Sequence, residues 1–250
     1  HEPRPLMGVS HLLEHMVFKG TPTRTARRLS LDIESLGGSL DAYTTREYTS
    51  YQARVLAEHL HVAADVIGDL VMRPLLRDED LALERNVIVE EIGMVEDTPD
   101  DLVFEKHGEL LWGDHPYGYS ILGTRETLAA LGTAELRALH ARAYHPGRLV
   151  VAASGNVDHE QLVATLVATG WGDMARGDDS ALATVPPVVR PPAYAHETDK
   201  SLTQTHVVFG SPTLPHRDDR RYAIALVNMV LGDGMSSRLF QTVREELGLA

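Results

Sequence analysis

Two histidines and a glutamate lie within five residues near the start of the chain, in the stretch HLLEH at residues 11–15. On an α-helix, His11 and His15 project about 40° apart, and Glu14 projects about 60° to the other side of His11. All three side chains therefore point into one sector. Two imidazoles one turn apart can each give a nitrogen to one Zn²⁺ ion, and a neighbouring carboxylate can take a proton from water. The pattern predicts a metal site with a general base beside it.

The same five residues also occur on surface helices whose histidines are simply hydrogen-bonded. Here the flanking triplets GVS and MVF are small or apolar, which favours burial, and buried imidazoles need partners. The spacing H-x-x-E-H is also the signature of inverzincin peptidases. A zinc site would need a third ligand from elsewhere in the chain.

A second set of acidic residues lies in the stretch 81–97, most of which falls in the helix expected at Asp78–Glu96. Its apolar stripe, set by the helical period, also contains Glu91 and Glu84, whereas Glu90 lies at the edge of the stripe. Carboxylates on a core-facing stripe are costly unless a cation or strong donors compensate them. We predict Glu91 as the third ligand and Glu84, about 10.5 Å away along the axis, as the group that orients a ligand histidine. The alternative is a position at the rim for both glutamates.

Periodicity predicts the elements that must position these residues. The expected helices are Leu6–Lys19, Glu58–Met72, Asp78–Glu96, Asp101–Trp112, Thr133–Tyr144, His159–Thr169, Asp218–Leu231 and Ser237–Leu247. The expected strands are Ser39–Thr45, Thr49–Leu56, Arg148–Ser154 and a further strand in TQTHVVFGSP, residues 203–212. We expect an α+β fold, in which helices pack against a mixed or antiparallel sheet.

Composition divides the chain into three parts. Residues 1–172 form a predicted catalytic domain, residues 173–195 a linker rich in proline and small polar residues, and residues 196–250 the start of a second domain. The chain begins at His1 and stops in a helical pattern. We therefore expect a fragment, with a first domain that lacks its start and a truncated second domain.

Charge and residue usage exclude several classes of site. Acidic residues outnumber basic ones by 36 to 23, which gives a formal net charge of −13 and argues against nucleic acid as a partner. The chain has no cysteine, so metal ligands must be His, Asp or Glu. No stretch approaches the roughly 20 apolar residues of a membrane-spanning helix.

Six stretches, taken in order, resemble sequence blocks of the pitrilysin or insulinase metallopeptidases, a family that includes the mitochondrial processing peptidase and bacterial half-length relatives. They are GVSHLLEHMVFKGT, LGGSLDAYTTREYTSYQARV, LERNVIVEEIGMVEDTPDD, HPYGYSILGT, YHPGRLVVAASGNVDHEQL and LGDGMSSRLFQTVREELGLA. Glu91 follows His15 by 76 residues, which is the spacing of the distal glutamate in that family. The family pattern and the helical phase therefore select the same residue.

The resemblance implies two related domains and a zinc-dependent endopeptidase that acts on extended or presequence-like peptides. It implies that His11, His15 and Glu91 bind one zinc ion, that Glu14 is the general base, and that Glu84 corresponds to the acidic residue seven positions before the ligand.

The resemblance also implies where a substrate lies and which partners the chain has. Peptides would add a strand at the sheet edge formed by Asp41, Ala42, Tyr43 and Thr44, although many relatives have Asn where this chain has Asp41. A purely structural hairpin is the alternative. A second homologous half or subunit would enclose the substrate, and catalytically silent subunits of this family lack the motif that is whole here. We expect a bacterial cytoplasmic protein, unless a segment before His1 carries a secretory signal.

Overall fold

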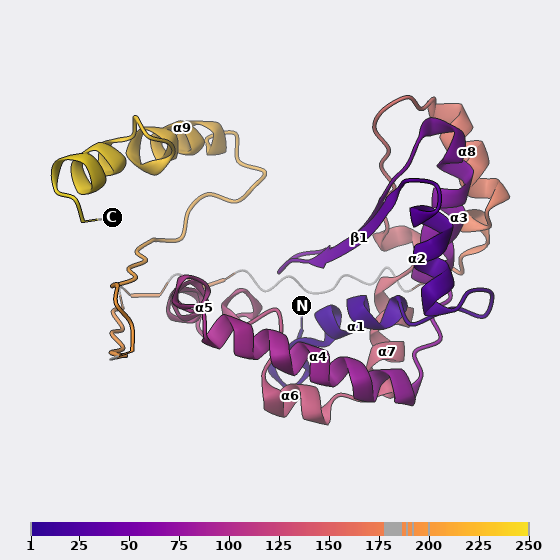
Figure 1. Cartoon of the computed structure of the whole chain (residues 1–250), viewed down its shortest axis with the longest axis horizontal. Helices are drawn as coiled ribbons and strands as arrows, with labels where there is room; N and C mark the ends of the chain where they lie inside the picture. Colours follow the sequence, from indigo (N-terminus) through magenta and orange to yellow (C-terminus); the bar gives the residue numbers. More distant parts are fainter. Residues whose placement is uncertain (1, 178–186, 189, 192, 200, 250) are drawn as a thin grey trace. The chain divides into compact units, whose positions relative to one another are not determined.

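The computed structural model describes residues 2–177, 187–188, 190–191, 193–199 and 201–249. The chain divides into two compact units, residues 1–208 and residues 209–250 (Figure 1). Part of the predicted linker, residues 178–186, 189 and 192, lies outside the described residues. The predicted domain limits stay a prediction.

The first unit has ten α-helices and strands in its described part. They are α1 (Val9–Val17), α2 (Ala26–Glu34), β1 (Ser39–Thr44), β2 (Thr49–Arg54), α3 (Leu60–Met72), α4 (Asp78–Glu96), α5 (Pro99–Trp112), α6 (Arg125–Ala130), α7 (Thr133–Ala143) and α8 (His159–Ala168). Short 3₁₀ turns connect them at Arg4–Leu6, Ala57–His59, Pro116–Gly118, Pro146–Arg148 and Trp171–Asp173.

The predicted α+β class is confirmed. β1 and β2 form an antiparallel hairpin in which Ser39 pairs with Arg54 and Thr44 pairs with Thr49. Helices α1 and α2 contact β1, whereas α3 contacts β2. In Figure 1 the hairpin runs beside α2 and α3, and α1 lies next to α4 and α7.

One hydrophobic core joins these helices. It is built from apolar side chains of α1, α2, α3, α4, α6 and α7, with the following among its fully buried members: Leu12, Leu13, Met16, Leu29, Ile33, Val66, Leu70, Ile88, Leu128 and Leu136. Burying a side chain of this size contributes roughly 1.5–3 kcal/mol. The core therefore fixes α1 against α4, the two helices that carry the predicted site.

The second unit contains α9 (Arg221–Gly232) and a π-helical segment, Phe240–Glu246. The predicted helices at 218–231 and 237–247 fall on these two elements. Most residues of α9 are exposed within the described structure, and Ser237 is buried, with its Oγ accepting a hydrogen bond from the Phe240 N–H. Among the described residues, no helix combines the length and apolar composition needed to cross a membrane.

Two helices are absent from the sequence-based predictions. The hydroxyl of Thr25 caps α2 by accepting a hydrogen bond from the Arg28 N–H, and Leu29 and Ile33, one turn apart, are fully buried. Thr124 caps the short helix α6 in the same way. A threonine cap before one or two apolar residues was the signal in each case, and it is weak because the helices have only nine and six residues.

Two predicted strands are wrong. Arg148 ends a 3₁₀ turn, and residues 149–154 pair with no described strand. Residues 203–212 likewise have no ladder partner in the described part of the chain. Runs that contain valine, leucine or phenylalanine have strand propensity, but a ladder also requires a neighbouring strand with free N–H and C=O groups. Val150, 93% exposed, has no such neighbour to cover it.

A buried carboxylate anchors the loop that follows α1. Asp69 of α3 is fully buried and accepts hydrogen bonds from the Thr21 hydroxyl at 2.5 Å and from the Thr23 hydroxyl at 2.6 Å. The guanidinium groups of Arg24 and Arg73 donate to it at 3.0 and 2.9 Å. Burial opposes ionisation, but these hydrogen bonds outweigh it and lower the pKa of Asp69. The loop is therefore held to α3 by charge.

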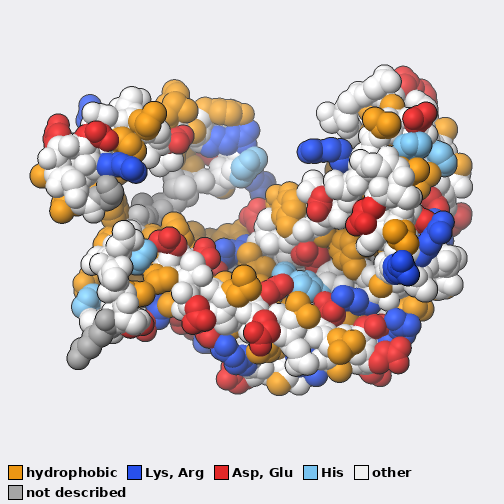
Figure 2. All heavy atoms as spheres, in the orientation of Figure 1, with side chains coloured by type: hydrophobic (Ala, Val, Ile, Leu, Met, Phe, Trp, Pro, Cys, Tyr) orange, Lys and Arg blue, Asp and Glu red, His pale blue; other side chains and the backbone are white. Residues whose placement is uncertain are grey.

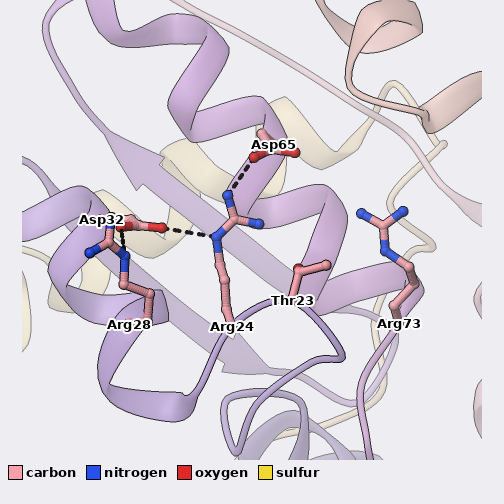
Figure 3. Close-up of a pocket in the computed structure, with 6 residues that line it drawn as sticks. All are labelled: Thr23, Arg24, Arg28, Asp32, Asp65 and Arg73. Atoms are coloured by element: carbon pink, nitrogen blue, oxygen red, sulfur yellow. Dashed lines mark hydrogen bonds and ion pairs between the residues drawn. The ribbon is translucent and has the colours of Figure 1, made fainter.

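Figure 3 shows the surface hollow that adjoins this cluster. Arg24 donates to Asp32 at 2.9 Å and pairs with Asp65, while Arg28 also pairs with Asp32. Each of the three arginines that line the hollow pairs with an aspartate in it or beside it. No residue of the predicted metal site lines this hollow. Its contribution is structural, because it joins α2, α3 and the loop after α1.

Replacement of Asp69 should therefore destabilise the first unit. Asp69→Asn is expected to cost the lower end of the roughly 3–5 kcal/mol typical of a broken buried pair, because Arg24 keeps its other two partners. Asp65→Asn, at a more exposed position on the same arginine, should cost less than about 1 kcal/mol. Urea unfolding followed by circular dichroism measures both.

The sign of the pH dependence follows from the lowered pKa of Asp69. Its stabilising effect is present above the unfolded-state pKa of about 3.9 and is lost as the pH falls through the lower folded-state pKa. The difference between the wild type and Asp69→Asn should therefore shrink below about pH 4. A difference that grows with acidity would contradict the assignment.

Candidate metal centre

Helix α1 is apolar on one side and polar on the other. Its side chains at Val9, Leu12, Leu13, Met16 and Val17 are buried in the core. Three polar side chains share the opposite sector, as predicted: His11, Glu14 and His15. The rings of His11 and His15 meet edge to face with centroids 4.6 Å apart.

The start of α1 is fixed by close backbone contacts. Gly8 has a φ of +91°, and a Cβ atom there would lie 2.7 Å from the carbonyl oxygen of Leu122, so only glycine fits. The carboxylate of Glu2 accepts hydrogen bonds from the N–H groups of Gly8 and Ser10, at 2.9 and 2.8 Å. These contacts satisfy otherwise unpaired donors at the helix start and set the rotation of α1.

The third predicted ligand approaches from α4. Oε2 of Glu91 lies 3.7 Å from Nε2 of His11, and its Oε1 lies 3.7 Å from Nε2 of His15. These separations are too long for hydrogen bonds. Ligand atoms about 2.1 Å from a tetrahedral zinc ion would lie about 3.4 Å apart. One atom from each of the three residues lies within 4.8 Å of the other two, so the set fits a small divalent ion.

Glu84 lies two turns before Glu91 on the same side of α4, and it is 6% exposed. Its Oε2 is 3.1 Å from Nδ1 of His15, so with the proton on Nδ1 the lone pair of Nε2 points towards Glu91. Its Oε1 is 2.6 Å from Nζ of Lys19. Glu84 thus lies within hydrogen-bond distance of His15, and its orienting role stays a prediction.

Lys19 was missed by the sequence analysis. The signal for it was a basic residue four positions after His15, at the spacing of one helical turn. Its ammonium group offsets the charge of the buried Glu84 carboxylate. Lys19 is thus one of the cations that a carboxylate on the core-facing stripe requires.

His11 is held in the neutral form. Burial lowers the pKa of His11 to about 4, with a further contribution from the neighbouring His15. Its Nδ1 atom is buried and has no hydrogen-bond partner among the described residues. A neutral imidazole keeps a lone pair for a metal ion, and metal affinity depends on that form. The donor set of two imidazoles and a carboxylate is typical of catalytic zinc sites.

Glu14 lies beside the two histidines and is 8% exposed. Burial raises the pKa of its carboxyl, and the charge of Glu91 raises it further, whereas a hydrogen bond from Thr44 and the proximity of His15 lower it. The net shift is upward. A carboxylate whose pKa rises towards neutrality is better suited to exchange protons in catalysis.

The four predicted residues of the hairpin divide between its two faces. Thr44 points inwards, and its hydroxyl donates to Oε2 of Glu14. Asp41 and Tyr43 are exposed on the other face, and Ala42 is half-buried. β1 pairs with β2 along one edge, and within the described part of the chain its other edge has no partner strand.

The tip of the hairpin is fastened to the region around α5. Tyr117 donates a hydrogen bond to Glu47 at 2.5 Å, and Arg46 lies 3.6 Å from Glu105 of α5. The Tyr117 ring packs edge-on against Trp112 at the end of α5. These contacts hold the hairpin over the site.

In the space-filling view, the face between β1 and α4 shows histidine side chains beside acidic ones (Figure 2).

Comparisons with known proteins place this geometry in context. Residues 1–125 match the family described as Insulinase (Peptidase family M16), and residues 130–250 match the Peptidase M16 inactive domain. All residues of the candidate site lie in the first match. An uncharacterized zinc protease of Streptomyces coelicolor is 41% identical over all of this chain and 55% of its own length. One of Bacillus subtilis is 38% identical over all of this chain and 60% of its length.

Solved structures agree on the fold. A protease from Helicobacter pylori superposes with a TM-score of 0.85 at 18% identity, over all of this chain and 61% of that protein. Pitrilysin matches with a TM-score of 0.65 at 25% identity, over 76% of this chain and 21% of that protein. The chain thus spans little more than half the length of the first relatives that it matches.

The geometry predicts which glutamate of α4 binds metal. Glu91→Gln should weaken zinc binding by more than about 100-fold, whereas loss of an outer group such as Glu84 costs about 10–100-fold. Glu90→Gln is the matched control, because Glu90 is the exposed neighbour on the same helix, and it should bind as the wild type does. Metal analysis after dialysis against buffered zinc measures all three. Loss of zinc from Glu90→Gln alone would show that the helical phase is wrong.

Proposed function

The chain belongs to the insulinase family, peptidase family M16, and on this premise we propose that its first 125 residues carry the zinc-binding and catalytic groups of an endopeptidase. The observation that supports this best is the convergence of Glu91 on both His11 and His15, with a ring nitrogen of each at 3.7 Å. Glu14 lies on the same helical sector as the two histidines. A structural metal site would not need such a neighbouring carboxylate.

The proposed ligands are His11, His15 and Glu91. A zinc ion held there would polarise the carbonyl of a peptide bond and lower the pKa of water towards about 7. The chain's own contribution is orientation: Glu84 fixes the ring of His15, and Lys19 pairs with Glu84 and holds it in place. Three protein ligands leave a coordination position for water and substrate.

Glu14 is the proposed general base. Its Oε2 is occupied by the Thr44 hydroxyl, and no hydrogen bond from a described residue reaches its Oε1. This oxygen is the proposed acceptor for the proton of the attacking water. The same atom can return the proton to the nitrogen of the leaving amine, which needs one when the peptide bond breaks.

The free edge of β1 is the proposed place for the substrate backbone. An extended peptide can add to such an edge through main-chain hydrogen bonds, which accept varied sequences. Asp41 and Tyr43, on the exposed face of β1, are the proposed side-chain contacts. Extended peptides are therefore the proposed substrate class, and presequence-like segments remain a prediction, as does the cytoplasmic location.

A second homologous half or subunit is part of the proposal. In the described structure, α5 and the hairpin flank the site, and the chain covers 55% of the Streptomyces relative. Activity is therefore expected from the whole natural protein.

Replacement of Glu14 tests the catalytic role. Glu14→Gln should keep about one zinc ion per site, because Glu14 is not a proposed ligand, and should lose about 10²–10⁴-fold in kcat, the range for a general acid–base group. Quenched extended peptides and the whole natural protein are the assay. Glu90→Gln is the control for loss of one negative charge near the site. Turnover by Glu14→Gln close to that of the wild type would remove Glu14 from the mechanism.

A further inference from the structure

Two hydroxyl groups of the hairpin lead to the carboxylate of Glu14. Thr44 and Thr49 are cross-strand partners in the hairpin, and their Oγ1 atoms are 3.2 Å apart. Thr44 donates a hydrogen bond to Oε2 of Glu14. Both threonines are half-buried.

The direction of these hydrogen bonds follows from counting protons. Each hydroxyl has one hydrogen to donate, and an ionised carboxylate only accepts. Since the hydrogen of Thr44 goes to Glu14, Thr49 must donate to Thr44. The two donors thus point the same way, and bonds aligned in this manner strengthen one another by polarisation.

We propose that Thr44 is a positioning residue for Glu14, and that the Thr49 hydroxyl acts through it. Thr44 holds Oε2 of Glu14 and leaves Oε1 as the atom that receives the proton of the attacking water. This inference rests on the proposed function, because it assigns a task to each oxygen of the proposed base. The side chain of Thr44 faces inwards to Glu14. Only the main chain of Thr44, at the free edge of β1, is then available for contact with a substrate.

Removal of the Thr44 hydroxyl tests the positioning role in the whole natural protein loaded with zinc. Thr44→Val should lower kcat by about 10- to 100-fold, the effect of one lost hydrogen bond to a charged group, and leave KM within about twofold. Thr44→Ser keeps the hydroxyl and should recover most of kcat. Zinc content and the temperature of unfolding should match the wild type for both variants.

Ser50→Ala is the matched control. Ser50 lies between Thr49 and Tyr51 in β2, so its side chain faces the other side of the hairpin, and it should leave kcat unchanged. Crystal structures add a readout besides activity, with one orientation of the Glu14 carboxylate in Thr44→Ser and more than one in Thr44→Val. An unchanged kcat in Thr44→Val, or a rise in KM alone, would overturn the proposal.

A double-mutant cycle tests whether Thr49 acts through Thr44. Thr49→Val keeps the shape of the side chain but removes the hydroxyl that donates to Thr44, and it should lower kcat by about two- to tenfold. In the Thr44→Val background the same change should have no further effect, because coupled residues are not additive. Additive effects would refute action through Thr44. Should Thr44→Val fail to fold, Thr49→Val and Thr44→Ser still test the pair.

Failure of this inference can be told apart from failure of the proposed function. If the wild type hydrolyses peptides and Glu14→Gln does not, but Thr44→Val equals the wild type, only the positioning role is wrong. If Glu14→Gln equals the wild type, the proposed general base is wrong, whatever the Thr44 variants do.

Discussion

The packing of α1 against α4 is the constraint on which the candidate site depends. Each helix has an apolar side that enters the common core, and each carries carboxylate or imidazole groups next to that side. Burying these groups is costly unless they compensate one another. The cost is met by pairs that cross between the helices: Glu84 with His15 and Lys19, and Glu91 facing both histidines. Only one relative rotation of the two helices allows all of these contacts together.

That rotation is held at both ends of α1. Before the helix, Gly8 lies against the backbone near Leu122, and Glu2 caps the first turn. After it, the loop with Arg24 is bound to the buried carboxylate of Asp69. A metal site needs its ligands within about 0.5 Å of the productive geometry. Attachment of α1 at two points, one before the helix and one after it, limits the movement of its two proposed ligands.

The two faces of the hairpin have different contacts: one faces Glu14 and the other is exposed. Because side chains alternate along a strand, Thr44 can reach Glu14 while Asp41 and Tyr43 stay exposed, and the free edge of β1 stays open to a peptide backbone. Binding and positioning thus use different atoms of the same strand. The hydrogen bond between Glu47 and Tyr117 fixes the tip of the hairpin. It thereby helps to keep both the free strand edge and Thr44 in place relative to α1.

Local periodicity determined much of this protein. The common sector of His11, Glu14 and His15, the shared face of Glu84 and Glu91, and the bounds of α4 follow from 3.6 residues per turn, which depends only on neighbouring residues. Tertiary structure alone decided which groups meet across long separations: Lys19 with Glu84, Thr44 with Glu14, and Tyr51 with Tyr144, 93 residues away. It also left residues 149–154 without a described ladder partner, although their apolar run, LVVAAS, has strand propensity. The physical reason is that helical phase is a local property, whereas contacts and strand pairing depend on where the packed core places distant segments.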